Sequence, residues 1–217
     1  MTLEKLDPKL ICFDLDGTLI DTMQSYADVA ADLLSVRHGM NRAEARQRYL
    51  ETCGLPFVGQ VDLIVGRNDL NKNLETVEIF EEKKLEATKG VRMEQFDKDV
   101  LQALKNKGYR LAISSNNTQE NVDRFIRQEA LQDVPGLGFV SGGHAKGEEH
   151  FAYLSEVTSV PRDRMLFVAD GLKDAEIAQK CRVDFVGKLG TFRREDFETK
   201  GVSYIIAQLK DLLDLLA

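Results

Sequence analysis

Residues 9–20, Lys9-Leu-Ile-Cys-Phe-Asp-Leu-Asp-Gly-Thr-Leu-Ile20, join a short apolar run to a pair of acids. The run Leu10–Phe13 predicts a buried strand, and Gly17 permits a tight turn after it. Strands of an open parallel sheet carry their ligands at their carboxyl ends. Asp14 and Asp16 would lie at such an edge, where two carboxylates are costly unless a cation lies between them. Taken alone, the same pattern also fits an acidic turn that caps a helix.

The composition is that of an ordinary globular protein, and 217 residues suit one domain with a sizeable insertion or a core with a small second domain. The formal net charge of -7 and the scattered basic residues predict no nucleic-acid partner. No long apolar region follows the N-terminus, so we expect no signal peptide, no membrane anchor and a cytoplasmic location. Cys12, Cys53 and Cys181 lack metal-ligand spacing and are expected to be reduced thiols.

The segment 22–88 shows only helical periodicity. Apolar residues recur at helical spacing in 23–37, and again in 57–65 and 74–84. Asn41 would cap a further helix between the first two. We therefore expect an all-helical domain, inserted after the first strand and long enough to act as a cap over the edge of a sheet.

From about Gly90 onward, helices and strands alternate, which predicts a parallel sheet with right-handed crossovers. The expected fold class is α/β, with a Rossmann-like doubly wound core of residues 1–21 plus 89–217 and an all-helical cap domain of residues 22–88. The expected strands of the second part are 109–114, 139–140, 165–169 and 183–186. The expected helices there are 96–107, one from Asn117 or Thr118, 148–158, 172–181 and 204–216.

Polar residues follow the other predicted strands. Residues 114–116, Ser-Ser-Asn, end one strand at a helix N-terminus, which suits an anion, although simple N-capping would explain them as well. Asp170 ends another strand, with Asp174 one turn into the next helix, and a helix cap is again the alternative. Lys146 lies in a loop before a helix, where a solvated charge is common. A parallel sheet would gather these groups at one edge, as a site for a metal ion and a phosphate.

With these residues in place, the chain resembles the haloacid dehalogenase-like (HAD) superfamily over essentially its whole length, in the subclass with a helical cap after the first motif. The opening motif of that family, hydrophobic-Asp-x-Asp-Gly-Thr-Leu, is matched by residues 13–19. The second motif is a Ser or Thr that ends a strand, often followed by Asn. Ser115-Asn116 matches it best, and Ser114 is the alternative with a shift of one residue. The third motif is a lysine before a helix, matched by Lys146.

The fourth motif, Gly-Asp with a second acid four residues later, is matched by Asp170 and Asp174. Two positions depart from the family pattern. Gly147 stands where a proline usually follows the lysine, and Ala169 stands in place of glycine. Both departures concern the backbone and leave the reactive groups unchanged. Residues 165–170, Met-Leu-Phe-Val-Ala-Asp, contribute to a resemblance to phosphoglycolate-phosphatase-like members.

The resemblance implies a phosphatase that hydrolyses a small phosphorylated metabolite through an aspartyl-phosphate. Asp14 would attack phosphorus, and Asp16 would protonate the leaving alkoxide and then take a proton from water. Lys146 and Ser115 would hold charge on the phosphoryl group. Asp174 would orient Lys146 or a metal-bound water without contacting the substrate itself.

The same resemblance implies a magnesium site, because Mg²⁺ prefers oxygen ligands. The ligands would be the carboxylates of Asp14 and Asp170 and the backbone carbonyl of Asp16. Three further residues would contact the phosphate: Gly17, Thr18 and Asn116.

Three alternatives remain open from the sequence. A phosphomutase of the beta-phosphoglucomutase type shares all four motifs, although its arginine-containing cap stretch is not evident here. Haloacid dehalogenase chemistry needs no acid at the position of Asp16, so the presence of Asp16 argues against it. A catalytically silent HAD-like binding module would usually lack Asp14 or Asp16, and both are present.

Candidate readers of the substrate in the cap are the 54–57 turn and Arg67, Asn68 and Lys72, all of which also fit ordinary surface or hinge positions. The oligomeric state is open between monomer and homodimer. An apolar stripe near the C-terminus, Ile205, Leu209, Leu212 and Leu216, is explained more simply by packing on the protein's own sheet than by a dimer seam.

Overall fold

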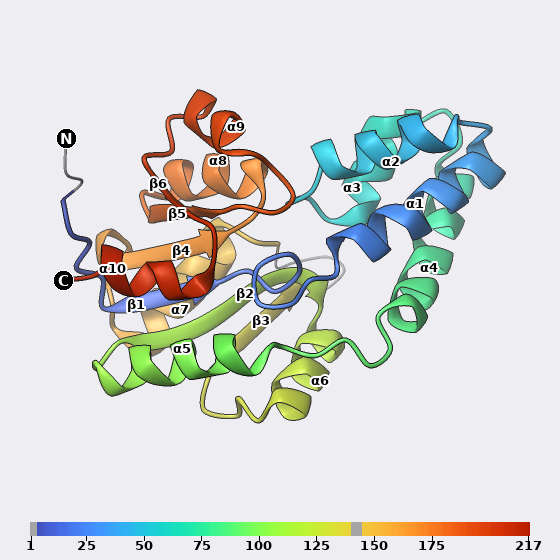
Figure 1. Ribbon diagram of the computed structural model, residues 1–217. Coiled ribbons are helices and arrows are strands. Elements are labelled where there is room, and N and C mark those ends of the chain that lie inside the picture. Colours follow the sequence, from blue (N-terminus) through green and yellow to red (C-terminus); the bar gives the residue numbers. More distant parts are fainter. Residues whose placement is uncertain (1–3, 140–144) are drawn as a thin grey trace. The chain divides into compact units, whose positions relative to one another are not determined.

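Figure 1 shows the computed structural model of the chain, which describes residues 4–139 and 145–217. The chain divides into two compact units. One, the core unit, comprises the residues up to Ile20 and those from Arg92 onward, and the other, the helical unit, is Asp21–Val91. The expected α/β fold with an inserted helical segment is thereby confirmed. Among the described residues, no helix is long and apolar enough to cross a membrane.

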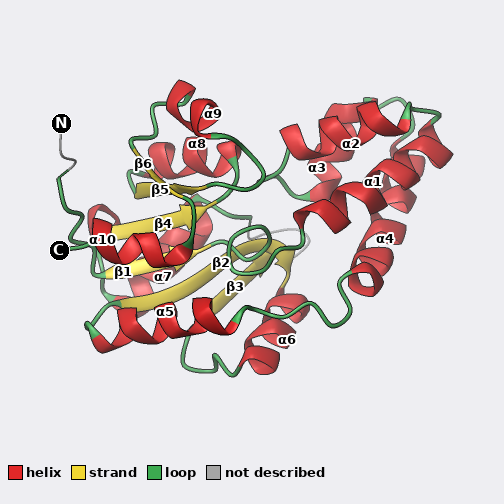
Figure 2. Cartoon of the chain, in the orientation of Figure 1, coloured by secondary structure: helices red, strands yellow, loops and turns green. Residues whose placement is uncertain are grey.

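The core unit contains one parallel sheet, drawn in yellow in Figure 2, whose strands run in the order β3-β2-β1-β4-β5-β6. Their bounds are β1 Leu10–Phe13, β2 Arg110–Thr118, β3 Gly136–Phe139, β4 Met165–Ala169, β5 Asp184–Lys188 and β6 Tyr204–Ile206. The strand order reverses direction between β1 and β4, which pair through Phe13 and Val168 at their carboxyl ends. Ligands of open α/β sheets bind at such a switch point.

Alternate residues of the strands pack against helices on opposite faces, as the two-residue period of a strand requires. Ile11 and Phe13 of β1 belong to one apolar cluster with helices α5, α6 and α10, whereas Leu10 and Cys12 belong to another with α7 and α8. The helix bounds in this unit are α5 Gln95–Asn106, α6 Gln119–Glu129, α7 Glu148–Thr158, α8 Leu172–Cys181, α9 Arg194–Thr199 and α10 Leu212–Leu215. The strands are therefore covered on both faces, and their polar groups gather at the strand ends.

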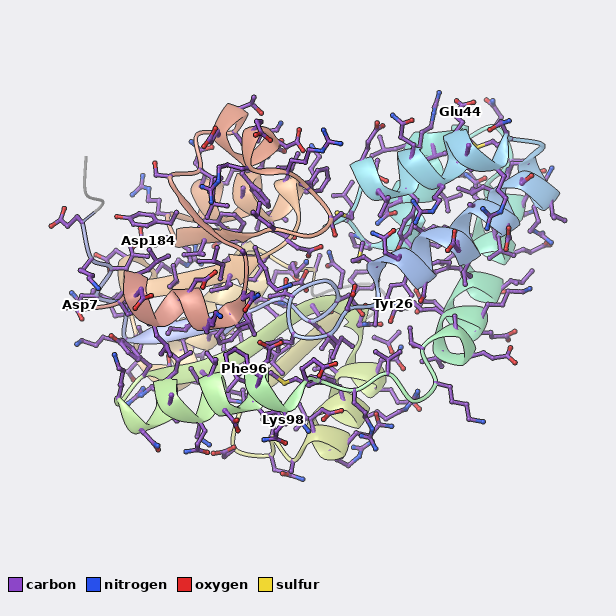
Figure 3. All side chains as sticks on the ribbon, in the orientation of Figure 1. Asp7, Tyr26, Glu44, Phe96, Lys98 and Asp184 are labelled. Atoms are coloured by element: carbon purple, nitrogen blue, oxygen red, sulfur yellow. The ribbon has the colours of Figure 1, made fainter. Side chains whose placement is uncertain are left out.

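The helical unit consists of α1 Met23–His38, α2 Arg42–Glu51, α3 Phe57–Val65 and α4 Leu70–Ala87. The side chain of Asn41 accepts hydrogen bonds from the N–H groups of Ala43 and Glu44, so the expected cap is present. Phe57 stacks on Phe80 with ring centroids 3.8 Å apart. Tyr26, labelled in Figure 3, packs edge-on against Phe80 in the same aromatic core.

The prediction of one C-terminal helix over 204–216 is wrong. Strand β6 occupies its beginning and pairs with β5, whose edge a helix at this position would leave unpaired. A short 3-10 turn, Leu209–Asp211, and α10 follow. Leu209, Leu212 and Leu216 are nevertheless buried in the core cluster, so this stripe packs on the protein's own sheet.

Strand β2 is longer than expected and ends in an irregularity. Its register with β3 shifts between Ser114 and Thr118, and such bulges re-aim side chains next to functional sites. Gly138 of β3 lies directly against this segment, where a Cβ would come within 2.7 Å of the backbone of Gln119. Strand β3 ends at Phe139, and Val140 of the expected strand lies outside the described residues.

Replacing Gly138 by alanine should therefore destabilise the protein by about 1–3 kcal/mol, because the backbone must move to admit the methyl group. Urea denaturation with and without the substitution measures this cost. Gly59→Ala is the control, since Gly59 lies inside α3 with open space around it. A helical glycine of that kind should become more stable as alanine, by about 0.5–1 kcal/mol. An unchanged free energy of unfolding in Gly138→Ala would contradict the close approach.

Candidate active site

The turn after β1 is compact. Gly17 has a φ of +77°, and the carbonyl oxygen of Leu15 accepts hydrogen bonds from the N–H groups of Thr18, Leu19 and Ile20. Only glycine adopts such a φ at little cost. The N–H group of Asp14 donates to the carbonyl of Val168 on β4, 2.9 Å away, which fixes the start of the turn to the neighbouring strand.

Lys146 connects two of the predicted acids. Its Nζ lies 2.8 Å from Asp14 Oδ2 and 2.8 Å from Asp174 Oδ1, and all three side chains are buried. The following residue, Gly147, has a φ of +118°, and a Cβ there would lie 3.0 Å from Ile177. A proline, whose ring fixes φ near -65°, could not adopt this conformation. The departure at Gly147 therefore matches the local backbone.

Asp170 follows β4 and is held by two hydroxyl groups. Thr18 Oγ1 donates to Asp170 Oδ1 at 3.4 Å, and Thr191 Oγ1 donates to Asp170 Oδ2. Lys188, at the end of β5, donates from Nζ to the carbonyl oxygen of Gly17 at 3.0 Å. The sequence did not indicate Thr191 or Lys188 as site residues, because the fifth predicted strand ends two residues before β5 does. Their one signal is a place at the end of the strand next to β4, and the apolar residues of that strand do not show where it ends.

The Ser-Ser-Asn-Asn segment, residues 114–117, contacts the acid turn on one side and the lysine on the other. Ser115 Oγ accepts from the N–H group of Asn117 at 3.0 Å, and Asn117 Nδ2 donates to Asp16 Oδ2. Asn116 Oδ1 accepts from the backbone N–H of Lys146 at 3.1 Å. Asn117 was predicted only as a possible helix start, and its contact with Asp16 depends on the irregular end of β2.

Ser114, the alternative for the second motif, is engaged elsewhere. Its Oγ lies 2.6 Å from Nδ1 of His150 in the first turn of α7, and both side chains are buried. Ser115 Oγ instead accepts from the N–H group of Asn117, the residue whose side chain contacts Asp16. The geometry therefore favours Ser115 as the hydroxyl that faces the acid turn.

The charges of the cluster do not balance. Within the described part of the core unit, it brings together the buried carboxylates of Asp14, Asp170 and Asp174 and the buried ammonium of Lys146. Three negative charges against one positive charge leave an excess of two negative charges when every group is ionised. Such an excess is costly away from water.

The pKa values of the cluster are shifted, first by burial and then by the neighbouring charges. Burial raises the pKa of Asp170 to about 7, and the charge of Asp14 adds to the rise. Burial also raises the pKa of Asp14 and that of Asp174, against the attraction of Lys146. For Lys146, burial acts to lower the pKa, but the carboxylates of Asp14 and Asp174 outweigh it and hold that pKa above its usual range.

The donor set fits a divalent cation of the Mg²⁺ kind. The excess of two negative charges equals the charge of one such ion. No group of three His, Cys, Asp or Glu side chains among the described residues forms a metal cage. Mg²⁺ needs no such cage, since it commonly binds one or two carboxylates and completes its shell with water and substrate phosphate. Asp14 and Asp170, at the ends of adjacent strands, supply two carboxylates of that type.

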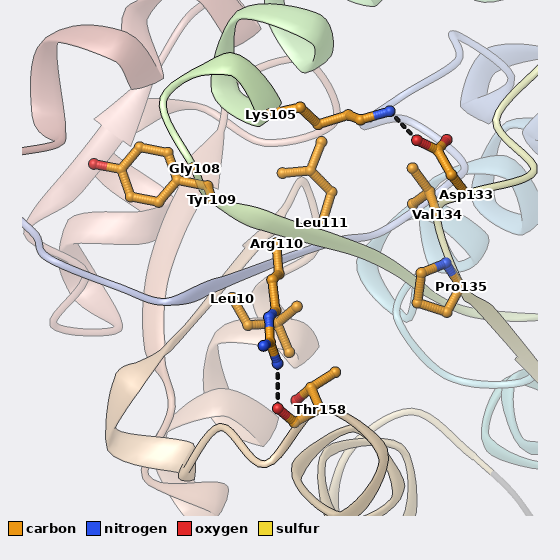
Figure 4. Close-up of a pocket in the computed structure, with 10 residues that line it drawn as sticks. All are labelled: Leu10, Lys105, Gly108, Tyr109, Arg110, Leu111, Asp133, Val134, Pro135 and Thr158. Atoms are coloured by element: carbon orange, nitrogen blue, oxygen red, sulfur yellow. Dashed lines mark hydrogen bonds and ion pairs between the residues drawn. The ribbon is translucent and has the colours of Figure 1, made fainter.

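A pocket of about 340 Å³ lies at the opposite, amino end of the sheet (Figure 4). Leu10, Leu111 and Val134 contribute apolar walls. The two cationic side chains that line it already have partners, since Lys105 pairs with Asp133 and Arg110 donates to the carbonyl of Thr158. None of Asp14, Asp170, Asp174 and Lys146 is among the residues that line it. We therefore assign the candidate active site to the carboxyl edge of the sheet.

The chain is similar to known proteins over most of its length. The family model described as haloacid dehalogenase-like hydrolase matches residues 11–188 of the chain. A phosphoglycolate phosphatase of Vibrio parahaemolyticus is 26% identical over 232 residues, and the match covers 97% of each chain.

Two solved structures share the fold. A hydrolase from Pseudomonas syringae superposes with a TM-score of 0.82 at 17% identity, over 95% of this chain and 96% of that one. A CbbY variant from Rhodobacter sphaeroides, solved with xylulose-(1,5)bisphosphate, superposes with a TM-score of 0.75 at 16% identity, over 97% and 100% of the two chains.

The raised pKa values predict how stability depends on pH. Asp14 and Asp170 bind protons more tightly in the folded chain than in the unfolded chain, where an aspartate titrates near 4. Their contribution to the free energy of unfolding is therefore present at low pH and is lost as pH rises from about 4 to about 7. Added Mg²⁺ should raise the melting temperature at about pH 8 and have little effect at about pH 5.

Thermal unfolding of the metal-free protein with and without Mg²⁺ measures both effects. Asp170→Asn is the matched variant, because it removes one of the two titrating carboxylates. It should weaken the pH dependence and reduce the stabilisation by Mg²⁺. Equal stabilisation by Mg²⁺ in the wild type and in Asp170→Asn would contradict this assignment.

Proposed function

The chain belongs to the haloacid dehalogenase-like hydrolase family, and we propose that this protein is a Mg²⁺-dependent phosphatase that hydrolyses a small phosphorylated metabolite through an aspartyl-phosphate. The observation that carries the proposal is the buried cluster in which Lys146 Nζ lies 2.8 Å from both Asp14 and Asp174, beside Asp170. A transferring phosphoryl group needs a nucleophile, positive charge and fixed geometry, and this cluster offers all three.

Asp14 is the proposed nucleophile. Its Oδ1 accepts a hydrogen bond from the N–H of Leu15 at 2.7 Å, and its Oδ2 contacts Lys146. These contacts hold the carboxylate in one orientation. A carboxylate oxygen of Asp14 would form a bond to phosphorus as the bond from phosphorus to the substrate oxygen breaks. Lys146 would stabilise charge on the phosphoryl oxygens, with Asp174 holding the ammonium from the other side.

Asp16 is the proposed acid and base. The amide N–H of Asn117 can only donate, so Oδ2 of Asp16 is the acceptor in that pair and a proton on Asp16 belongs on Oδ1. Asp16 would give this proton to the departing alkoxide. It would then take a proton from the water that attacks the aspartyl-phosphate, which releases inorganic phosphate and restores Asp14. Ser115 would contact the phosphoryl oxygens, whereas the N–H groups of Gly17 and Thr18 already donate within the turn, to the carbonyls of Ile20 and Leu15.

The carboxylates of Asp14 and Asp170 and the backbone carbonyl of Asp16 would hold Mg²⁺. When bound, the ion supplies positive charge that lowers the repulsion between the anionic nucleophile and the anionic substrate. Thr18 and Thr191 hold Asp170 in place for this role through their hydroxyl groups.

The helical unit is the proposed cap, which reads the part of the substrate other than phosphate. Arg67 is exposed, pairs with Asp62 at 3.1 Å and remains a candidate reader with Asn68 and Lys72. Phe57 is buried on Phe80, so it serves the core of this unit. The phosphoglycolate phosphatase relative suggests a small acidic substrate such as 2-phosphoglycolate.

Asp14→Asn should lower phosphate release by roughly 10³-fold or more, because an amide cannot form the aspartyl-phosphate. The assay is phosphate release from an aryl phosphate with Mg²⁺. Asp184→Asn is the matched control, since Asp184 is an exposed acid at the amino end of β5, labelled in Figure 3. Full activity in Asp14→Asn would refute the mechanism.

A panel of phosphorylated metabolites with Mg²⁺ tests the reaction class and the substrate. We expect free phosphate to appear, fastest with a small acidic monoester, and a chelator should stop it reversibly. Beta-glucose 1-phosphate belongs in the panel, because a mutase would convert it to glucose 6-phosphate without net phosphate release. Turnover that is unimpaired by the chelator would argue against the magnesium site, and no release from any monoester would reject the phosphatase.

A further inference from the structure

Two contacts join the end of β2 to the segment that carries Lys146. Asn116 Oδ1 accepts from the backbone N–H of Lys146 at 3.1 Å. Ser114 Oγ and His150 Nδ1 lie 2.6 Å apart, and His150, in the first turn of α7, follows Lys146 by four residues. The two contacts therefore lie on both sides of Gly147, where the backbone takes its unusual φ.

We propose that Ser114, Asn116 and His150 form a clasp that positions Lys146, an inference that rests on the proposed role of this lysine. Residues 114 and 116 of β2 hold the lysine segment, whereas residues 115 and 117 serve the acid turn through Asn117 and Asp16. The four consecutive polar residues thus divide between the two halves of the site. His150 and Ser114 become positioning residues, neither of which touches the substrate.

The burial of the pair supports a purpose beyond packing. Ser114 and His150 are 0% and 1% exposed, and polar groups are buried at such depth only at a cost that a hydrogen bond must offset. Apolar side chains would fill this layer more cheaply, as their neighbours Phe151 and Ala112 do. The pair instead fixes the first turn of α7 to β2, and therefore the point from which the long Lys146 side chain extends.

The position of Lys146 has to be exact because its ammonium is shared between two carboxylates. A shift of the backbone would change both 2.8 Å contacts, to Asp14 and to Asp174, at once. Gly147 does not restrain the backbone next to Lys146, because glycine is conformationally permissive. The clasp supplies the missing restraint from a strand of the central sheet.

Acetylation of Lys146 by acetic anhydride, followed by mass spectrometry, tests the clasp without a substrate. Ser114→Ala and His150→Leu each remove one partner of the buried hydrogen bond. Each should raise the acetylation rate of Lys146 by about tenfold, since one lost hydrogen bond favours opening of the segment by that factor. Lys98, which pairs with the buried Glu129 in the same unit, reports any general loosening.

Two further variants separate positioning from general stability. Ser155→Ala removes a hydrogen bond between Ser155 Oγ and the carbonyl of Val160, at the far end of α7. It should leave the reactivity of Lys146 unchanged. His150→Asn should protect Lys146 from acetylation as the wild type does, because an asparagine amide reaches about the position of Nδ1.

If a variant of the buried pair fails to fold, Asn116→Ala removes the other contact of the clasp at a less buried side chain, and it should expose Lys146 likewise.

In the phosphatase assay, the clasp variants should lose about 10- to 100-fold in kcat, and His150→Asn should recover most of it. Equal acetylation of Lys146 in the wild type, Ser114→Ala and His150→Leu would overturn the clasp. An enzyme that releases no phosphate from any monoester would reject the proposed function instead, while the acetylation rates would still decide whether the clasp exists.

Discussion

The buried contact of Lys146 with Asp14 and Asp174 is the constraint on which the rest of the core unit depends. Removing one partner from a buried ion pair typically costs about 3–5 kcal/mol, because a charge is left without compensation. Chain segments that are far apart in the sequence must therefore meet at one point. Strand β1 brings Asp14, the start of α8 brings Asp174, and the segment before α7 brings the lysine between them.

The same arrangement bears on the phosphoryl chemistry that we propose for this site. The cluster is rich in carboxylates and poor in positive charge, so the protein alone cannot hold a phosphate dianion there. A divalent cation would remove the deficit and permit substrate to enter. In the proposed phosphatase, Asp14 would therefore face a phosphorus atom only when metal and substrate are both bound.

Much of this could be predicted from the sequence, because parallel strands deliver their carboxyl ends to a common edge. That rule brought Asp14 and Asp170 together, and the order of the motifs along the chain added Lys146. It could not locate Thr191 or Lys188, since β5 continues beyond its strongly apolar residues. The contact of Asn117 with Asp16 depends on an irregular strand end that propensity does not reveal. The helical spacing of Leu209, Leu212 and Leu216 correctly indicated burial, but not that β6 would occupy the sheet edge before them.

The order of the segments along the chain has a consequence for folding. Strand β1 pairs with β2 and β4, and both are synthesised only after the whole helical unit. The apolar residues Leu10–Phe13 must therefore remain without sheet partners while Asp21–Val91 completes its own core. Pairings between distant segments form slowly, and an unpaired apolar strand invites association with other chains. A central strand of the native sheet is thus exposed to misassociation while the protein is being made.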